Sequence, residues 1–124
     1  MTLEDKKTGN IDLQQINGLI EAAGIAGAKE IMVAFWRSTT TLLDSLDQHL
    51  AAADYKSIIE AAHALKGSAA NVGASDISEF ARAVEVGARE EDLEAAIDAN
   101  DLLKDSVDAA RIALDQHFEK SAAA

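Results

Sequence analysis

The absence of proline constrains the fold of this chain more than any other sequence feature. None of its 124 residues is a proline, so no position is barred from a helix interior by a missing backbone N–H. Alanine, the residue with the highest helix propensity, is abundant. No segment shows the sustained alternation of Val, Ile and Thr with polar residues that indicates a strand. We therefore predict an all-α fold.

Apolar residues recur at three- and four-residue spacing in five segments. These segments cover approximately residues 12–23, 28–53, 55–71, 75–87 and 91–118. Gly24 and Gly27 mark the end of the first helix and the turn after it, and Gly73 ends the third. Short connections favour antiparallel neighbours. The sequence thus predicts an antiparallel up-down four-helix bundle, with an additional N-terminal helix packed across one end.

The same periodicity assigns core positions and domain limits. In the first two helices the inward positions are Leu13, Ile16, Leu19, Ile20, Ile31, Phe35, Leu42, Leu46 and Leu50. Of the adjacent pair Phe35 and Trp36, we expect one ring to be buried and the other partly exposed. We expect a flexible N-terminus over 1–10, one bundle domain over 11–118 and a flexible C-terminal tail over 119–124.

Charge and composition exclude several classes of function. The formal net charge is −11, which would repel nucleic acid and anionic membrane surfaces. No apolar run approaches the roughly 20 residues of a membrane span, and no signal peptide is recognisable. The chain has no cysteine, which fits a reducing compartment, so we expect a cytoplasmic protein. The many carboxylates of the last helix lie outside its apolar stripe, which indicates a solvated face.

One short segment, AAHALKGSAANVG at 61–73, stands out against this background. Residues three and four apart share a helix face, so His63, Lys66, Gly67 and Ala70 form one stripe. The apolar stripe of the same helix runs through Ala62, Leu65 and Ala69 and is rotated away from it. We therefore expect the His63 ring to face solvent.

Each residue of this stripe has a use if His63 is a nucleophile for phosphoryl groups. A neutral imidazole nitrogen can attack phosphorus, and a nearby ammonium such as Lys66 disfavours the imidazolium form. Lys66 can also stabilise the charge of the transferring group. Gly67 costs about 1 kcal/mol of helix propensity, which makes sense if a side chain there would block a partner. The Ser68 hydroxyl either hydrogen-bonds near the site or bonds back to the helix.

A family resemblance supports the phosphoryl reading. The segment resembles the signature of histidine-containing phosphotransfer (HPt) domains through His63, Leu65, Lys66, Gly67, Ser68 and Gly73. The resemblance continues into the flanking segments ADYKSIIEAAH and ISEFARAVE, and the five-helix order of the family matches residues 11–118.

The resemblance implies a function in two-component signalling. A phosphorelay intermediate of this family carries a phosphoryl group on the motif histidine, here His63, and exchanges it with the aspartyl phosphate of a receiver domain. The expected partners are response-regulator receiver domains, a hybrid histidine kinase, or both. The resemblance implies a phosphocarrier without kinase activity and without a cofactor of its own, because the receiver would supply the Mg²⁺. We expect a monomer.

The polar residues of the following helix are weaker candidates. Arg82 and Arg89 are possible partner contacts, whereas we excluded Glu85 because a carboxylate would not bind a phosphate. Two other readings remain open. One is a non-catalytic helical adaptor, which His63→Gln would leave unaffected. The other is a carrier protein with a phosphopantetheine arm on Ser45 of LLDSLDQ, although this serine lies inside a helix rather than at its start. His49 and His117 lack a second ligand one turn on.

Overall fold

The computed structural model describes residues 10–123. They form four helices, α2 (Leu13–Ala51), α3 (Tyr55–Asn71), α4 (Ser75–Arg89) and α5 (Leu93–Ala123), and no strand. The predicted all-α fold is confirmed. Residues 1–9 of the predicted flexible N-terminus lie outside the described part. None of the described helices is both long and apolar enough to cross a membrane.

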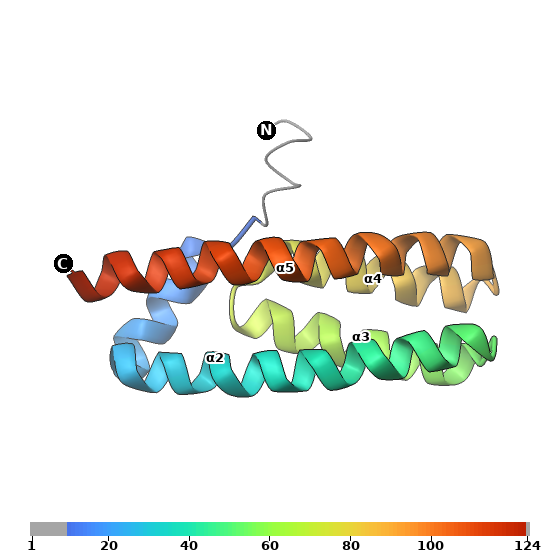
Figure 1. Cartoon of the computed structure of the whole chain (residues 1–124), viewed down its shortest axis with the longest axis horizontal. Helices are drawn as coiled ribbons and strands as arrows, with labels where there is room; N and C mark the ends of the chain where they lie inside the picture. The colour runs from blue at the N-terminus through green and yellow to red at the C-terminus, as the bar shows by residue number, and fades with distance from the viewer. Residues whose placement is uncertain (1–9, 124) are drawn as a thin grey trace.

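The helices form an antiparallel bundle. α3 packs against α2 and α4, α4 packs against α5, and α2 also contacts α5, so the four elements enclose one core. Figure 1 shows the N-terminal part of α2 crossing one end of the bundle, between the end of α5 and the beginning of the long part of α2. The predicted four-helix bundle with an N-terminal helix across one end is therefore confirmed.

Gly24 produces the change of direction inside α2. Its φ of 76° and ψ of 165° are the only non-helical values within the helix, and glycine adopts such values readily because it has no Cβ. The predicted break at Gly24 is confirmed, but Gly27 is helical, so the expected turn between the two glycines is a single residue.

Two predicted core positions of α2 are wrong. Leu13 is 50% exposed and Ile31 is 39% exposed, whereas Met32 is buried. In this region apolar residues occupy consecutive positions, so spacing alone does not say which of them faces inward. Phe35 and Trp36 are both buried, with ring centroids 4.9 Å apart in an edge-to-face arrangement, so the expected partial exposure of one ring is also wrong.

The last helix is longer than predicted. α5 continues to Ala123, beyond the predicted end at Phe118, and so covers most of the segment expected to be a flexible tail. Alanine and serine present no barrier to helix propagation, and the Ser121 hydroxyl donates a hydrogen bond to the His117 carbonyl. The helix therefore has no sequence signal that would end it at Phe118.

The N-terminal segment holds the turn between α3 and α4. Gly73 makes this turn with a φ of 77°, and its carbonyl accepts a hydrogen bond from the Asp12 amide at 2.8 Å. The buried Asp76 carboxylate accepts a hydrogen bond from the Asn10 amide, also at 2.8 Å. These bonds fix where α3 ends and α4 begins, and thus how the two helices lie against each other.

Candidate functional site

His63 lies on the outer face of α3. Its side chain is 64% exposed. Toward the C-terminal end of α3, its exposed neighbours Ala64, Gly67 and Ala70 are small. The opposite face of α3 carries fully buried residues, among them Ala62, Leu65 and Ala69. The predicted outward orientation of the ring is confirmed, and apart from Lys66 the next turn of α3 presents only small side chains beside it.

Gly67 faces open space. A Cβ built on this residue would meet no atom within 4 Å, and its backbone conformation is helical. Neither packing nor backbone geometry therefore requires a glycine at this position. The loss of about 1 kcal/mol of helix propensity relative to alanine is not offset within the described fold.

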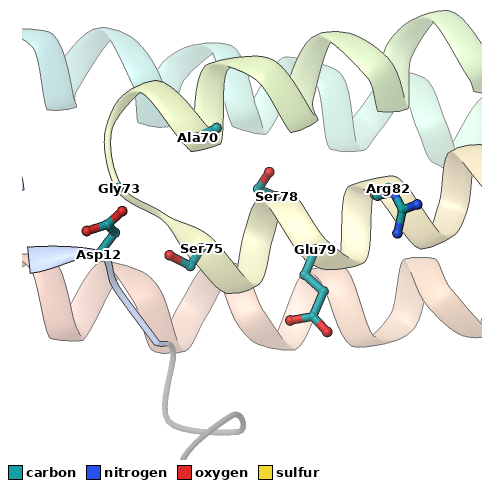
Figure 2. Close-up of a pocket in the computed structure, with 7 residues that line it drawn as sticks. All are labelled: Asp12, Ala70, Gly73, Ser75, Ser78, Glu79 and Arg82. Atoms are coloured by element: carbon teal, nitrogen blue, oxygen red, sulfur yellow. The ribbon is translucent and has the colours of Figure 1, made fainter. Parts of the chain in front are cut away.

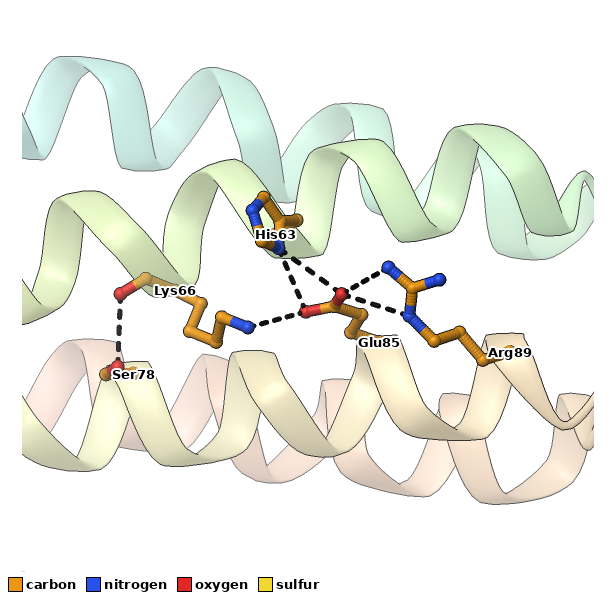
Figure 3. A network of polar contacts seen from close by, with 5 residues as sticks. All are labelled: His63, Lys66, Ser78, Glu85 and Arg89. Carbon is orange, nitrogen blue, oxygen red and sulfur yellow. Dashed lines mark hydrogen bonds and ion pairs between the residues drawn. The ribbon is translucent and has the colours of Figure 1, made fainter.

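Glu85 of α4 is the centre of a polar network that reaches His63 (Figure 3). Its side chain is only 6% exposed. Its carboxylate oxygens lie 3.3 and 3.4 Å from His63 Nδ1, 3.0 Å from Lys66 Nζ and 2.8 Å from Arg89 Nη2. One carboxylate thus holds three side chains, two from α3 and one from its own helix.

The surroundings of Glu85 keep it ionised. Burial by itself raises the pKa of the carboxyl group, but hydrogen bonds from Arg89 and Lys66, the charge of Lys66 and the contact with His63 outweigh burial. Together they lower the pKa of Glu85 to about 2. Around neutral pH the group is therefore a carboxylate, which accepts hydrogen bonds and donates none.

This carboxylate determines which ring nitrogen of His63 is available. Because an ionised Glu85 can only accept, the hydrogen bond to it requires a proton on Nδ1. In the neutral ring the lone pair then lies on Nε2. The site therefore combines an exposed imidazole ring of fixed tautomer, two cations bound to the same carboxylate, and small residues on the next turn of α3.

The comparisons with known proteins agree with this geometry. The family model for the Hpt domain matches residues 30–113, which is more than half of the chain. The chain belongs to the Hpt family. Membership supports a histidine phosphotransfer role in a phosphorelay. Members of the family are phosphocarriers rather than kinases, and they interact with response regulators and histidine kinases.

A solved structure shares the fold of this Hpt chain. It is histidine-containing phosphotransfer protein B (HptB) from Pseudomonas aeruginosa PAO1, with a TM-score of 0.83 and 22% sequence identity. The match covers 90% of this chain and 96% of the other. At this level of identity the likeness establishes the fold alone. No curated protein matches the sequence.

Sequence reasoning missed the residue that organises this Hpt site. Glu85 is left out of the predicted site because a carboxylate would not bind a phosphate, whereas the structure places Glu85 against the ring and the two cations. A signal was present: Glu85 lies among the inward positions Ala81, Val84 and Ala88 of α4, all of them buried. A glutamate on an apolar stripe needs cationic partners, which points to Arg89 one turn on.

The remaining predicted site residues lie close by. The Lys66 ammonium forms an ion pair with Glu85, and this carboxylate in turn contacts the His63 ring. Ser68 donates to the Leu65 carbonyl at 3.2 Å, which is the second of the two roles expected for it. The Ser78 hydroxyl donates to the Lys66 carbonyl at 3.0 Å and ties α4 to α3 beside the site.

A pocket lies where the end of α3 turns into α4 (Figure 2). It is lined by Asp12, Ala70, Gly73, Ser75, Ser78, Glu79 and Arg82. Arg82, a predicted partner contact, is exposed there, whereas Arg89 is bound to Glu85. The pocket is therefore polar, with side chains of both charges in its lining.

The other candidates do not form sites. Ser45 is half-buried in the middle of α2, not at a helix start. His117 Nε2 lies 2.8 Å from Asn17 Oδ1. Within residues 10–123, no group of three His, Asp or Glu side chains could hold a metal ion.

Proposed function

We propose that this Hpt chain is a phosphorelay intermediate that carries a phosphoryl group on His63 Nε2 and exchanges it with the aspartyl phosphate of response-regulator receiver domains. The observation that carries the proposal is the hydrogen-bonded pair of His63 and Glu85. It leaves Nε2 exposed with its lone pair, on a face where Gly67 keeps space for a docked partner.

The transfer step follows from this tautomer. The Nε2 lone pair attacks the phosphorus, a P–N bond forms, and the P–O bond to the receiver aspartate breaks. The aspartate leaves as a carboxylate with the electron pair. The ring becomes a phosphorylated imidazolium whose proton stays on Nδ1, against Glu85. In the reverse step the carboxylate attacks and the pair returns to Nε2.

Lys66 and Arg89 give the site positive charge. Both are held within 3.0 Å of Glu85, and both are partly exposed, with 31% and 58% of their side chains accessible. We assign Lys66 to stabilising the transferring phosphoryl group, since it lies one turn from His63 on the same helix. The receiver supplies the aspartate and its Mg²⁺, and this chain acts as a monomer in the cytoplasm.

The open surface near His63 is suited to a second protein. Ala64, Gly67 and Ala70 give α3 small exposed side chains next to His63. The hydrogen bond from the Ser78 hydroxyl to the Lys66 carbonyl joins α4 to α3 next to this surface. The receiver must bring its aspartyl phosphate within about 3 to 3.5 Å of Nε2, and this smooth face permits that approach.

Transfer from a phosphorylated receiver domain tests the proposal. Incubation of the protein with a ³²P-labelled receiver should move label to the protein, and the label should be acid-labile and alkali-stable, as a phosphoramidate bond is. His63→Gln should abolish labelling, while His49→Gln and His117→Gln should retain it. Labelling that survives in His63→Gln would refute the assignment of the site. If His63→Gln binds receivers normally and no receiver transfers label to the wild type, the chain is an adaptor.

A further inference from the structure

We infer that the Glu85 carboxylate keeps the Nδ1 proton on the ring after His63 is phosphorylated, and so makes the phosphohistidine labile and readily transferred. This inference rests on the proposed function and concerns the phosphorylated state rather than the acceptance of phosphate. Glu85 is thus a positioning residue that acts through the ring.

The contact between Glu85 and the ring supports this role. The carboxylate lies 3.3 Å from Nδ1, the nitrogen that remains after Nε2 has bonded to phosphorus. Because the Glu85 side chain is 6% exposed, water screens this pair less than it screens a surface pair. A negative charge at this distance favours the protonated form of a ring.

The position of this proton decides how easily the P–N bond breaks. When Nδ1 carries a proton, the ring leaves as neutral imidazole as the pair returns to Nε2. When Nδ1 has lost its proton, the ring must leave as an imidazolide anion, a much poorer leaving group. A carboxylate that retains the proton therefore speeds both transfer to an aspartate and hydrolysis by water.

The charged groups around the ring can be named for each helix that packs on α3. From α4, Glu85 contacts the ring, and Arg89 binds the Glu85 oxygen that also contacts Nδ1. From α3 itself, Lys66 points to Glu85, at 3.0 Å, and the exposed Glu60 lies one turn before the ring. Among residues 10–123, α2 has no charged side chain in hydrogen-bonding contact with the ring. The two cations hold Glu85 in its ionised form and do not themselves contact Nδ1.

Chemical phosphorylation with phosphoramidate separates this inference from partner recognition. His63 is labelled directly in the full chain, and its ³¹P resonance is identified by comparison with His63→Gln. The pH midpoint of that resonance and the half-life of the phosphohistidine are then measured in the wild type, Glu85→Gln and Glu85→Asp. Glu30→Gln is the matched control, because Glu30 is exposed on α2 and has the same change of charge.

We expect Glu85→Gln to lower the pH midpoint by about one unit or more, the range for loss of an opposite charge in contact. The half-life at pH 8 should rise up to about tenfold, because the protonated fraction falls about tenfold per unit. Glu85→Asp, which keeps the charge, should restore part of the shift, and Glu30→Gln should match the wild type.

Three results would overturn the inference. One is a Glu85→Gln midpoint within about 0.3 unit of the wild type in a variant whose circular dichroism and melting are those of a folded protein. Another is a ¹⁵N spectrum of the unphosphorylated protein with the ring proton on Nε2. The third is a Glu85→Gln phosphohistidine whose half-life at pH 8 equals that of the wild type. If Glu85→Gln shows the lowered midpoint but the wild type accepts no phosphoryl group from any receiver, only the proposed function is refuted.

Discussion

At the residue scale, Gly67 weakens α3 at a position where no neighbouring atom requires a glycine. The absence of any contact within 4 Å of a Cβ there means that the fold would accept a larger residue. The functional interpretation is that a docked partner protein occupies this space. The two readings differ in what a side chain at this position does to stability and to transfer.

Substitution of Gly67 separates stability from transfer. Gly67→Ala should raise the free energy of unfolding by up to about 1 kcal/mol, because alanine restores helix propensity and meets no atom. Gly67→Gln should leave the protein folded and slow receiver transfer at least about tenfold. Urea unfolding and a phosphotransfer time course measure the two effects. Ala34→Gln, on an exposed face of α2, is the control, and equal transfer rates for Gly67→Gln and the wild type would contradict the expectation.

Glu85 should also make stability depend on pH. Its pKa in the folded state, about 2, lies below its ordinary value of 4.5. The stabilisation is therefore complete above about pH 5 and declines as the pH falls toward 2, because protons then bind the unfolded state first. A shift of this size corresponds to at most about 3 kcal/mol.

Urea unfolding at pH 7, 5, 4 and 3 measures this contribution. Between pH 5 and pH 3 the wild type should lose about 1 to 2 kcal/mol more than Glu85→Gln, which has no carboxyl group at this position. Glu30→Gln is the control and should follow the wild type. Parallel losses in the wild type and Glu85→Gln would show that Glu85 is not held in the ionised form.

At the scale of elements, local signals predicted where most helices begin and end. Asp54 immediately precedes α3, and its carboxylate accepts a hydrogen bond from the Ser57 amide at 3.2 Å. Such caps involve residues three apart, so the sequence alone reveals them. The His63–Glu85 contact joins residues 22 positions apart, and it depends on how α3 and α4 pack. Periodicity places each residue on a face but does not say which residues of two helices meet.

Gly87 illustrates a packing requirement that periodicity did not show. A Cβ at Gly87 would lie 2.9 Å from the Ala96 amide nitrogen and 3.1 Å from Ala96 Cα, so the α5 backbone lies close against α4 there. Gly87→Ala should therefore lower the free energy of unfolding by about 1 to 3 kcal/mol, because the obstructing atoms are backbone and cannot turn aside.

Urea unfolding compares this variant with Gly18→Ala. Gly18 is also helical, and a Cβ there meets no atom within 4 Å, so its replacement should be neutral or stabilising. Equal stability of Gly87→Ala and Gly18→Ala would show that α4 and α5 can separate at this point without loss.

At the scale of the whole molecule, negative charge exceeds positive charge. The 22 acidic residues exceed the 11 basic ones, and α5 carries exposed carboxylates along its outer face. Repulsion among like surface charges destabilises a compact state, and salt screens it. The buried Glu85 network is screened less than these surface charges.

Salt should therefore stabilise this protein. We expect the melting temperature to rise by a few degrees between 10 and about 200 mM NaCl, over which the Debye length falls below about 10 Å. Thermal scans in KCl at equal ionic strength control for specific ion binding. A melting temperature that stays constant or falls would mean that surface ion pairs, such as Lys104 with Asp47 at 2.7 Å, outweigh the repulsion.

The hydrogen bonds between the first described residues and the α3–α4 turn affect the choice of boundaries for a fragment of this protein. The family match begins at residue 30, but Asn10 and Asp12, which precede it, hold the turn beside Gly73. A fragment trimmed to residues 30–113 would lose the Asn10 amide that binds the buried Asp76 carboxylate. A fragment cut at the family boundaries would therefore lose the hydrogen bonds that hold the turn between α3 and α4, the two helices of the site.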